Sequence, residues 1–411
     1  MAKEILRIGG GESLFGKVTV HGAKNAVLPM LAASVLTQSP VTVRDCPLIS
    51  DVDDMILVLR ALGVSAVRDG RNVTVSGAPS LTEIPAHLAC AMRSSVFMLG
   101  ALLAECGEVR LFAPGGCRIG ARPLDIHFDG FSRLGAEVEY GEDYVRCTAD
   151  RLRGADIVLK YPSVGATENL IMASVKAQGV TRLIGAAREP EIVSLVALLR
   201  KMGAEISGEG TPVVTVRGVD ALDGAAATPV GDRIVAGTVM AATAVCGGRV
   251  EISGADSSVL GAVISPFLGA HTFLVEHGGV IVFESDGMLS PTDVSTGPYP
   301  LFPTDMQAPF MACQCYASGM SSMRETVFED RFAHVGELVK MGARIALAGN
   351  TAFVDGSEGM HGAALSAADL RGGAGLVVAA LGAHGESTVD GLRYICLLYT
   401  SPSPRDISGS R

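Results

Sequence analysis

The sequence predicts an α/β protein of two domains, each built from three copies of one repeated unit, with the last copy incomplete. Its 411 residues suit two domains of about 100–200 residues each. The composition, 48% hydrophobic and 18% charged, is typical of chains that bury sizeable cores rather than of disordered chains. The third observation is an internal repeat with a period of 66 to 73 residues, and it decides the architecture.

Each copy of the repeat ends in a helix, a glycine and a hairpin. In the first copy, Met55, Ile56, Leu59 and Leu62 follow helical spacing, and Gly63 suits the helix C-cap. Alternating residues on both sides of a turn signal then predict a β-hairpin. The helix-ending glycines are Gly63, Gly135, Gly203, Gly269 and Gly342. The turn signals are Asp69-Gly70, Gly141-Glu142, Gly208-Glu209, Gly278-Gly279 and Gly349-Asn350.

A second helix, rich in small residues, runs into a turn and a strand between these hairpins. It occurs six times, near Ala33–Leu36, Cys106-Gly107, Gln178-Gly179, Cys246-Gly247, Ser318-Gly319 and His384-Gly385. The sixth hairpin should place its glycine near position 410, yet residues 401–411 are Ser-rich, contain two prolines and lack a helical stripe. We therefore predict that the sixth unit lacks its helix and hairpin and that residues 396–411 form a disordered, non-native tail.

The six units divide into two groups of three. One helix–hairpin unit cannot bury its apolar side alone, so neighbouring units must share a core. The midpoint, residues 225–232, is rich in small residues, Pro and Gly, which suits a hinge. A cleft between the two domains is then the expected ligand site.

Charge and cysteine content narrow the functional classes. The formal net charge is -10, which argues against a broad nucleic-acid-binding surface and favours a small-molecule partner. No apolar run is long enough for a signal peptide or a membrane span. The 9 Cys include no CxxC pair, which predicts reduced thiols and no zinc site. We expect a cytoplasmic protein that needs no metal or cofactor and shows no sign of a membrane or protein partner.

The loop from Pro114 to Pro123 is the most informative segment for chemistry. Its three glycines predict mobility, and Arg118 and Arg122 flank Cys117, where they would stabilise a thiolate. Cys117 is therefore a candidate reactive residue on a lid. The alternative is an ordinary small side chain, as for Cys106 and Cys246, which we interpret as buried hydrophobic residues.

Other candidates each have a structural alternative. Lys24 is either a solvated surface residue or, since its segment is apolar, a buried cation that needs an anion. The same two alternatives apply to Arg93, which lies on an apolar helix. Residues 163–169 predict a turn that opens a helix, which serves either as a simple N-cap or as a phosphate site. Asp305 is either an ordinary helix-start carboxylate or a base at the cleft. Residues 11–17 match GxxxxGK, but Val18 replaces the Ser/Thr that a nucleotide-binding loop requires.

Taken together, these segments resemble the enolpyruvyl transferase family. The resemblance runs from Met1 to about Ile395 and is carried by GAKNA at 22–26, the loop and helix start at 114–127, SVGATEN at 163–169 and FPTDMQAP at 302–309. It implies two inside-out α/β barrel domains of three units each. The N-terminal segment joins the second domain, so the implied domains are 23–230, which carries the Cys117 loop, and 1–22 with 231–395.

The resemblance also implies a reaction. The enolpyruvyl group of phosphoenolpyruvate passes to the 3-hydroxyl of UDP-N-acetylglucosamine, through a tetrahedral intermediate and with release of phosphate, in the first committed step of peptidoglycan synthesis. Cys117 matches the family's proton donor and Asp305 its base. Lys24 and Asn25 match contacts to phosphoenolpyruvate, Arg122 lies between the substrates, and Arg331 matches an arginine of the cleft. Positions matching contacts to the sugar nucleotide are Arg93, Pro123, Leu124, Asp125, Ile126, Ser163, Val164 and Val327.

One departure from the family pattern bears on activity. The family continues Asp-Arg-Gly-Tyr after Tyr394-Ile395, and its Arg contacts phosphoenolpyruvate, whereas this chain has Leu397 at that position. One alternative function is therefore that of a catalytically impaired homologue that still binds the sugar nucleotide. A second alternative is the shikimate-pathway enolpyruvyl transferase, which has the same fold.

Overall fold

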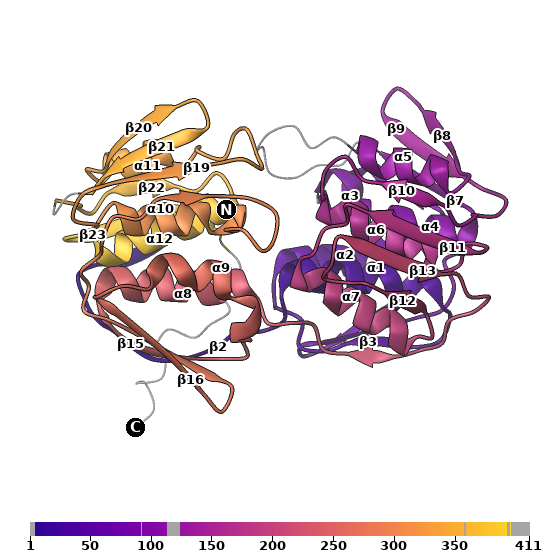
Figure 1. Cartoon of the computed structure of the whole chain (residues 1–411), viewed down its shortest axis with the longest axis horizontal. Coiled ribbons are helices and arrows are strands. Elements are labelled where there is room, and N and C mark those ends of the chain that lie inside the picture. The colour runs from indigo at the N-terminus through magenta and orange to yellow at the C-terminus, as the bar shows by residue number, and fades with distance from the viewer. Residues whose placement is uncertain (1–4, 92, 113–123, 357–358, 393–394, 396–411) are drawn as a thin grey trace. The chain divides into compact units, whose positions relative to one another are not determined.

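The computed structural model describes residues 5–91, 93–112, 124–356, 359–392 and Ile395. These residues form two compact units (Figure 1). The N unit contains the described residues of 22–230, and the C unit contains 5–21 and those of 231–395. The chain passes from one unit to the other after His21 and again after Val230.

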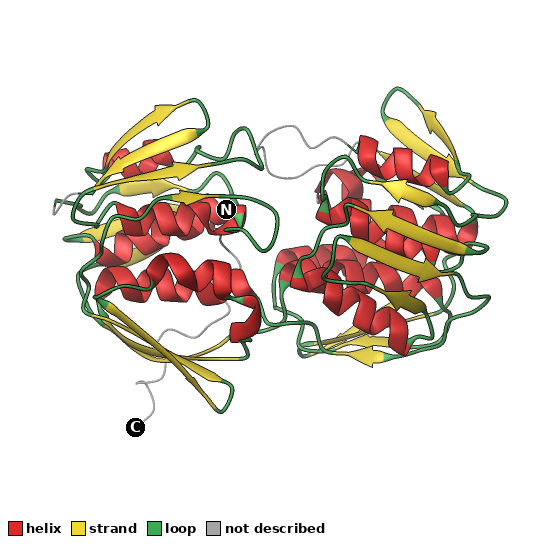
Figure 2. Ribbon diagram, in the orientation of Figure 1, coloured by secondary structure: helices red, strands yellow, loops and turns green. Residues whose placement is uncertain are grey.

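Both units confirm the predicted α/β class. In each, helices occupy the interior and sheets lie on the outside, as Figure 2 shows. The innermost helices therefore have no solvent-facing side. Every residue of Ala26–Ala33 in one such helix and of Ala166–Ser174 in another is buried. This explains why the sequence shows runs of small and apolar residues at these helices instead of an amphipathic stripe.

The N unit contains three four-stranded sheets. Their strand orders are β14(Ala226–Ala227)-β3(Val41–Val43)-β5(Asn72–Ser76)-β4(Ser65–Asp69), β6(Glu83–Ile84)-β7(Glu108–Phe112)-β9(Tyr144–Thr148)-β8(Glu137–Tyr140) and β10(Asp156–Val158)-β11(Val180–Ile184)-β13(Val213–Arg217)-β12(Glu205–Ser207). The helices are α1(Lys24–Ala33), α2(Ser50–Ala61), α3(Ala86–Ala91), α4(Met98–Cys106), α5(Asp125–Arg133), α6(Val164–Ser174) and α7(Pro190–Lys201), with 3-10 turns η1(Ser34–Leu36) and η2(Arg93–Phe97).

The C unit contains two four-stranded sheets and one three-stranded sheet. Their orders are β16(Thr272–His277)-β17(Val280–Ser285)-β15(Gly248–Ser253)-β2(Leu14–Thr19), β18(Val294–Ser295)-β19(Met320–Arg324)-β21(Thr351–Asp355)-β20(Arg344–Ala348) and β1(Leu6–Gly9)-β23(Glu386–Asp390)-β22(Ala364–Ser366). The helices are α8(Arg233–Cys246), α9(Gly261–Ile264), α10(Gln307–Gln314), α11(Val335–Lys340) and α12(Leu370–Gly382), with η3(Ser257–Val259), η4(Ser265–Phe267) and η5(Thr304–Met306).

The repeat appears as one strand pattern. In the third sheet of the N unit, β10 runs parallel to β11, β11 is antiparallel to β13, and β13 closes a hairpin with β12. Four of the predicted helix-ending glycines have positive φ: Gly63 (91°), Gly135 (92°), Gly203 (106°) and Gly342 (97°). Gly269 does not, because its helix is short and breaks into α9 and η4 at Pro266. The C-cap prediction is confirmed at four of the five positions.

The sixth sheet corrects the prediction that its whole hairpin is missing. β22 is parallel to β23, and β1 pairs antiparallel with β23 through Leu6↔Val389. β1 thus takes the place that β13 holds beside β11, so the N-terminus supplies one hairpin strand. The predicted tail, residues 396–411, lies outside the described residues. The segment that matches GxxxxGK runs into strand β2 rather than a helix, so it is no nucleotide-binding loop.

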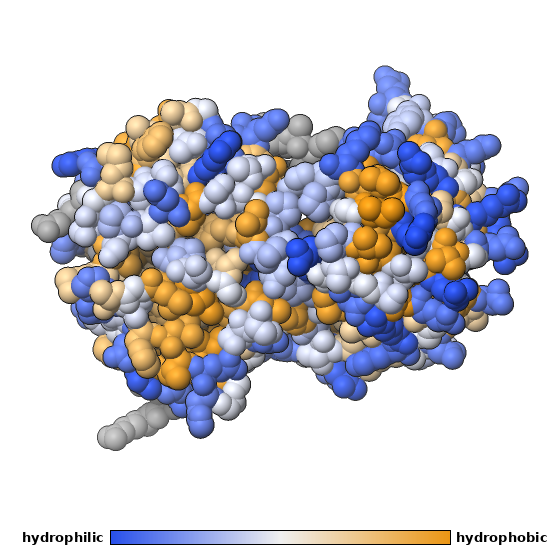
Figure 3. All heavy atoms as spheres, viewed as in Figure 1, coloured by the Kyte–Doolittle hydropathy of each residue, from blue (hydrophilic) through white to orange (hydrophobic). Residues whose placement is uncertain are grey.

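The packing of the inner helices depends on close backbone approach. A Cβ on Gly100 of α4 would lie 2.1 Å from the backbone oxygen of Asn169 in α6. Only glycine fits there, because real side chains never approach a carbonyl so closely. The strand residues Val158 and Val213 are exposed. Figure 3 shows that apolar residues lie among hydrophilic ones on the face in view.

Candidate active site

The C unit holds a half-buried carboxylate between two buried arginines. Asp305 is the second residue of η5, which begins after Pro303, and its side chain is 23% exposed. Nη2 of Arg331 donates to Oδ1 at 2.7 Å, and Nη2 of Arg371 donates to Oδ2 at 2.8 Å. The two arginine side chains are only 4% and 9% exposed. The structure therefore brings two predicted residues, Asp305 and Arg331, together and adds a third, Arg371.

The arginines set the protonation of the carboxylate. Burial alone would raise the pKa of Asp305, but the charges and hydrogen bonds of Arg371 and Arg331 outweigh it and hold this pKa well below its usual range. Asp305 is thus ionised and, while clamped, a weak proton acceptor. An anion that drew either arginine away would raise the pKa of Asp305 and make it a better base.

Arg371 is a site residue that sequence reasoning missed. It lies in the first turn of α12, where Asp369 caps the helix by accepting from the N–H groups of Arg371 (3.0 Å) and Gly372 (2.9 Å). A signal was present, because Arg371 is the one charged residue in an apolar, glycine-rich helix, the same pattern that singled out Arg93. A buried arginine requires an anion, and here Asp305 provides it.

His334 lies behind this cluster as a neutral group. Its side chain is buried, and its Cβ is 3.2 Å from the position of a Cβ on Gly372, so it packs against the start of α12. Burial is the main cause that lowers the pKa of His334 to about 4, and the charge of Arg331 acts in the same direction, although Asp369 opposes it. At neutral pH the imidazole adds no charge to the site.

The N unit presents its predicted residues on helix starts. Lys24 is the first residue of α1, and its Nζ lies 2.7 Å from Oδ1 of Asp51. The anion expected for a half-buried Lys24, whose side chain is 17% exposed, is therefore Asp51 in this structure. Asn25 follows and is exposed.

The starts of α5 and α6 form a second group. Ser163 is the N-cap of α6 and its Oγ accepts from the N–H of Ala166 at 3.3 Å, which confirms the predicted helix start. Val164 is the first residue of the helix. Leu124 is the N-cap of α5, and Asp125 and Ile126 open its first turn. Free N–H groups at two adjacent helix starts suit anionic ligands.

Asn169 ties these helix starts to each other. Its Oδ1 accepts from the N–H of Gly100 at 2.7 Å, and its Nδ2 lies 3.1 Å from the oxygen of Gly165 and 3.2 Å from Nδ1 of His127. Because an amide nitrogen only donates, Nδ1 of His127 must accept, which leaves the proton of the neutral ring on Nε2. Sequence reasoning did not find this link, since it joins three helices that are distant in the chain.

Several predicted residues lie outside what the structure describes. Cys117, Arg122 and Pro123 belong to the segment 113–123, and Leu397 lies beyond Ile395. The backbone of Arg93 begins η2, but its side chain is also outside the description. The remaining predicted contact, Val327, is half-buried, and its N–H donates to Oε1 of Glu325 at 2.8 Å.

Burial makes several of the described cysteines unreactive. Seven of the nine lie in described residues and are free thiols. Burial raises the pKa of Cys46 and Cys147 to about 12 and that of Cys246 to about 11. Thiols with such pKa values are poor nucleophiles at neutral pH. This agrees with our interpretation of Cys246 as a small apolar residue.

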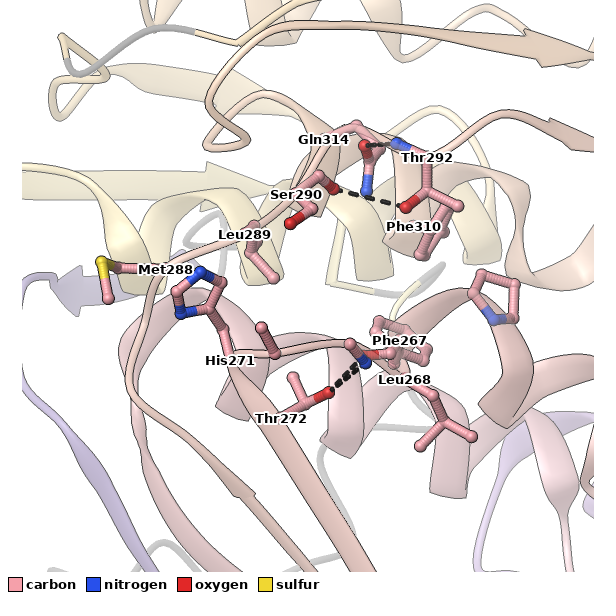
Figure 4. A pocket seen from close by; sticks show the side chains of 13 residues that line it. Phe267, Leu268, His271, Thr272, Met288, Leu289, Ser290, Thr292, Phe310 and Gln314 are labelled. Carbon is pink, nitrogen blue, oxygen red and sulfur yellow. Dashed lines mark hydrogen bonds between the residues drawn. The ribbon is translucent and has the colours of Figure 1, made fainter.

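One small pocket of the C unit is lined by residues other than the predicted ones. Figure 4 shows a small pocket in the C unit, lined by Phe267, His271, Met288, Phe310 and Gln314 among others. The amide of Gln314 closes one side of it by accepting from the N–H of Thr292 at 2.9 Å. Within the described residues, no cluster of His, Cys, Asp or Glu could hold a metal ion, and no helix is long and apolar enough to cross a membrane.

Helix-filled units of three sheets, with a half-buried carboxylate clamped by two arginines, define the class of the protein. The chain belongs to the EPSP synthase (3-phosphoshikimate 1-carboxyvinyltransferase) family, whose profile matches residues 8–399, and it is a transferase. A relative named UDP-N-acetylglucosamine 1-carboxyvinyltransferase 2 from Carboxydothermus hydrogenoformans is 43% identical over 94% of this chain and 93% of its own.

Two further comparisons agree with this family. UDP-N-acetylglucosamine 1-carboxyvinyltransferase of Gluconacetobacter diazotrophicus is 44% identical and covers 92% of this chain and 91% of its own. The crystal structure of the enolpyruvyl transferase NikO from Streptomyces tendae superposes with a TM-score of 0.86 at 26% identity, covering 98% of this chain and 96% of that one.

Proposed function

We propose that this chain transfers the enolpyruvyl group of phosphoenolpyruvate to the 3-hydroxyl of UDP-N-acetylglucosamine and releases phosphate. The observation that carries the proposal is Asp305, a half-buried carboxylate held between Arg331 and Arg371. The names of relatives with 43% and 44% identity support the sugar nucleotide over shikimate 3-phosphate as acceptor. The reaction would be the first committed step of peptidoglycan synthesis, in the cytoplasm.

The chemistry assigns a role to each part of this cluster. Addition to the enol requires a base at the sugar hydroxyl, a proton for the methylene carbon, and cations for the phosphate and carboxylate. Asp305 is the base. It gains basicity when an anionic substrate takes over an arginine that now lowers its pKa. Cys117 is the proton donor, and Lys24, Asn25 and Arg122 bind phosphoenolpyruvate.

The sugar nucleotide would bind through helix starts. The N–H groups at the beginnings of α5 and α6 can donate to the diphosphate, and the positive ends of the two helix dipoles add attraction. Ser163 already uses its hydroxyl for capping, so its contribution would be positional. The residues we assign to this ligand are Arg93, Pro123, Leu124, Asp125, Ile126, Ser163, Val164 and Val327, and Arg331 holds Asp305.

Phosphate release tests the assignment directly. Purified protein is incubated with phosphoenolpyruvate and either UDP-N-acetylglucosamine or shikimate 3-phosphate, and inorganic phosphate is measured. We expect release with the sugar nucleotide alone. Release only with shikimate 3-phosphate would assign the chain to the rival reaction.

A chain that binds UDP-N-acetylglucosamine in a calorimeter but never turns over, even after its end is rebuilt with Asp-Arg-Gly-Tyr and a complete sixth unit, would be a sugar-nucleotide-binding homologue without catalysis. The Cys117 assignment has a separate test. Cys117→Ser should lower turnover by about 10²-fold or more, the range for loss of an acid catalyst, and should abolish inactivation by an alkylating epoxide. Full activity of Cys117→Ser would exclude Cys117 as the donor.

A further inference from the structure

Glu325 is a buried carboxylate that no step of the proposed reaction uses. It is 2% exposed and directly follows β19. Because β18 and β19 run parallel, with Ser295 opposite Arg324, the next residues of the two strands, Thr296 and Glu325, meet at the same sheet edge. Oγ1 of Thr296 donates to Oε1 of Glu325 at 2.9 Å.

Four donors converge on this carboxylate. Besides Thr296, the N–H groups of Val327 and Phe328 donate to Oε1 at 2.8 and 3.2 Å. Oε2 accepts from Oγ1 of Thr304 at 2.8 Å. A buried acceptor that binds two backbone N–H groups and two hydroxyls holds the segments that carry them in place, since all four hydrogen bonds depend on it.

These segments flank Asp305 on both sides. Thr304 immediately precedes Asp305 in η5. On the other side, Val327 is a proposed sugar contact, and the ring of Phe328 lies 5.2 Å from the guanidinium carbon of Arg331, which binds Asp305. Glu325 is therefore linked to Asp305 through Thr304, and to Arg331 through the turn at 327–328.

We propose that Glu325 is a positioning residue that sets the geometry of Asp305, Arg331 and Val327 without touching substrate. The inference rests on the proposed function. It predicts that loss of the Thr304 link acts mainly on kcat, because it moves the base, and that loss of the whole carboxylate also weakens sugar binding, because it releases Val327. Displacements of about 1 Å at a reacting group cost up to about 10²-fold in rate.

The variants separate these links. Glu325→Gln keeps all four hydrogen bonds if the amide oxygen takes the three donors and Thr304 accepts from the amide nitrogen. Glu325→Leu removes all four, and Thr304→Val removes one while keeping shape. Thr326→Val is the matched control, because Thr326 lies in the same turn and its hydroxyl bonds the oxygen of Thr296 at 2.6 Å rather than Glu325.

The assay measures kcat and both KM values by phosphate release. We expect Thr304→Val to lose about tenfold in kcat with both KM values within about twofold, the loss typical of an outer-shell partner. Glu325→Leu should lose more in kcat and raise the KM for UDP-N-acetylglucosamine about tenfold, while Glu325→Gln and Thr326→Val stay within about threefold. Thr304→Val and Glu325→Leu with unchanged kinetics would overturn the inference.

Amide hydrogen exchange tests the same inference in the protein without substrate. Exchange at Val327 and Phe328 should accelerate at least about tenfold in Glu325→Leu and remain unchanged in Glu325→Gln, because only the former removes the acceptor. Unchanged exchange in Glu325→Leu contradicts the positioning role even in a chain without turnover. Absence of turnover in the unmutated chain, with accelerated exchange in Glu325→Leu, would instead refute the proposed function and leave the anchoring of this turn supported.

Discussion

At the residue scale, we expect Asp305 to affect both stability and turnover. Asp305→Asn would leave Arg331 and Arg371 buried without their anion, which costs about 3–5 kcal/mol of unfolding free energy for a broken buried pair. We also expect turnover to fall by about 10²-fold or more, because the variant lacks the proposed base. Urea unfolding and phosphate release measure the two effects, and Asp293→Asn, at an exposed residue, is the control.

The stability difference between Asp305→Asn and the unmutated chain depends on pH, and the direction of the pKa shift of Asp305 sets that dependence. The pKa of Asp305 is lower in the folded than in the unfolded protein, so its stabilisation is fully present above the ordinary carboxyl pKa of 3.8. It is lost progressively as the pH falls below that value. The stability gap between Asp305→Asn and the unmutated chain should therefore be constant at neutral pH and narrow in acid. A gap that widened in acid would contradict the clamp.

The pKa of Glu168 is shifted in the direction opposite to that of Asp305. Its side chain is fully buried in α6 with both oxygens unpaired, and burial, followed by the charges of Glu191 and Glu189, raises the pKa of Glu168 well above its usual range. Such a group destabilises the fold as the pH rises above the unfolded pKa of 4.5, where the unfolded chain loses its proton first. Glu168→Gln should therefore be more stable at pH 8, by on the order of 1 kcal/mol, and nearly neutral at pH 4. Thermal unfolding at both pH values checks this, with Glu12→Gln as an exposed control.

At the element scale, the starts of α5 and α6 depend on Asn169. Asn169→Leu keeps the size of the side chain but removes the oxygen that accepts from the N–H of Gly100, at about 1–3 kcal/mol for a buried group. We expect UDP-N-acetylglucosamine to bind about tenfold more weakly in calorimetry, because about 1.4 kcal/mol of lost positioning corresponds to tenfold. Ser174→Ala, a buried position on the same helix whose hydroxyl has no partner, is the control and should bind normally. Equal affinities for both variants would argue against ligand binding at these helix starts.

Elements with a local cause could be predicted from the sequence, and those with a distant cause could not. The helix C-caps at Gly63 and Gly203 follow from left-handed backbone that glycine alone adopts readily, so the sequence reveals them. The short strand β14 has no such signal, because Ala226–Ala227 is a strand only through its pairing with β3. Within the site, Asp305 was predicted by its motif, whereas Glu325 and Asn169 matter only through neighbours that folding brings to them.

At the scale of the whole molecule, the N-terminal strands complete the C unit. β1 pairs with β23 and β2 pairs with β15, across more than two hundred residues of intervening chain. No composition or periodicity reveals such pairings, which explains why the sequence predicted a missing hairpin where the structure has one of its strands. The structural integrity of the last sheet therefore depends on the first residues of the chain.

Ile8 tests this closure of the fold. It is 7% exposed on β1 and belongs to the apolar core of the C unit together with Val389 and Leu376. Ile8→Ala should cost about 2–4 kcal/mol and accelerate amide exchange in β22, β23 and α12, because the sixth sheet loses packing on its third strand. Helices α1 and α6 should keep their protection, since they lie in the core of the N unit. Arg7→Ala is the matched control on the same strand, because Arg7 is 74% exposed and its ion pair with Glu386 at 3.4 Å contributes little. If Ile8→Ala accelerated exchange equally in α6 and α12, the two units would unfold as one, and the N-terminal strand would stabilise the whole chain rather than the unit it completes.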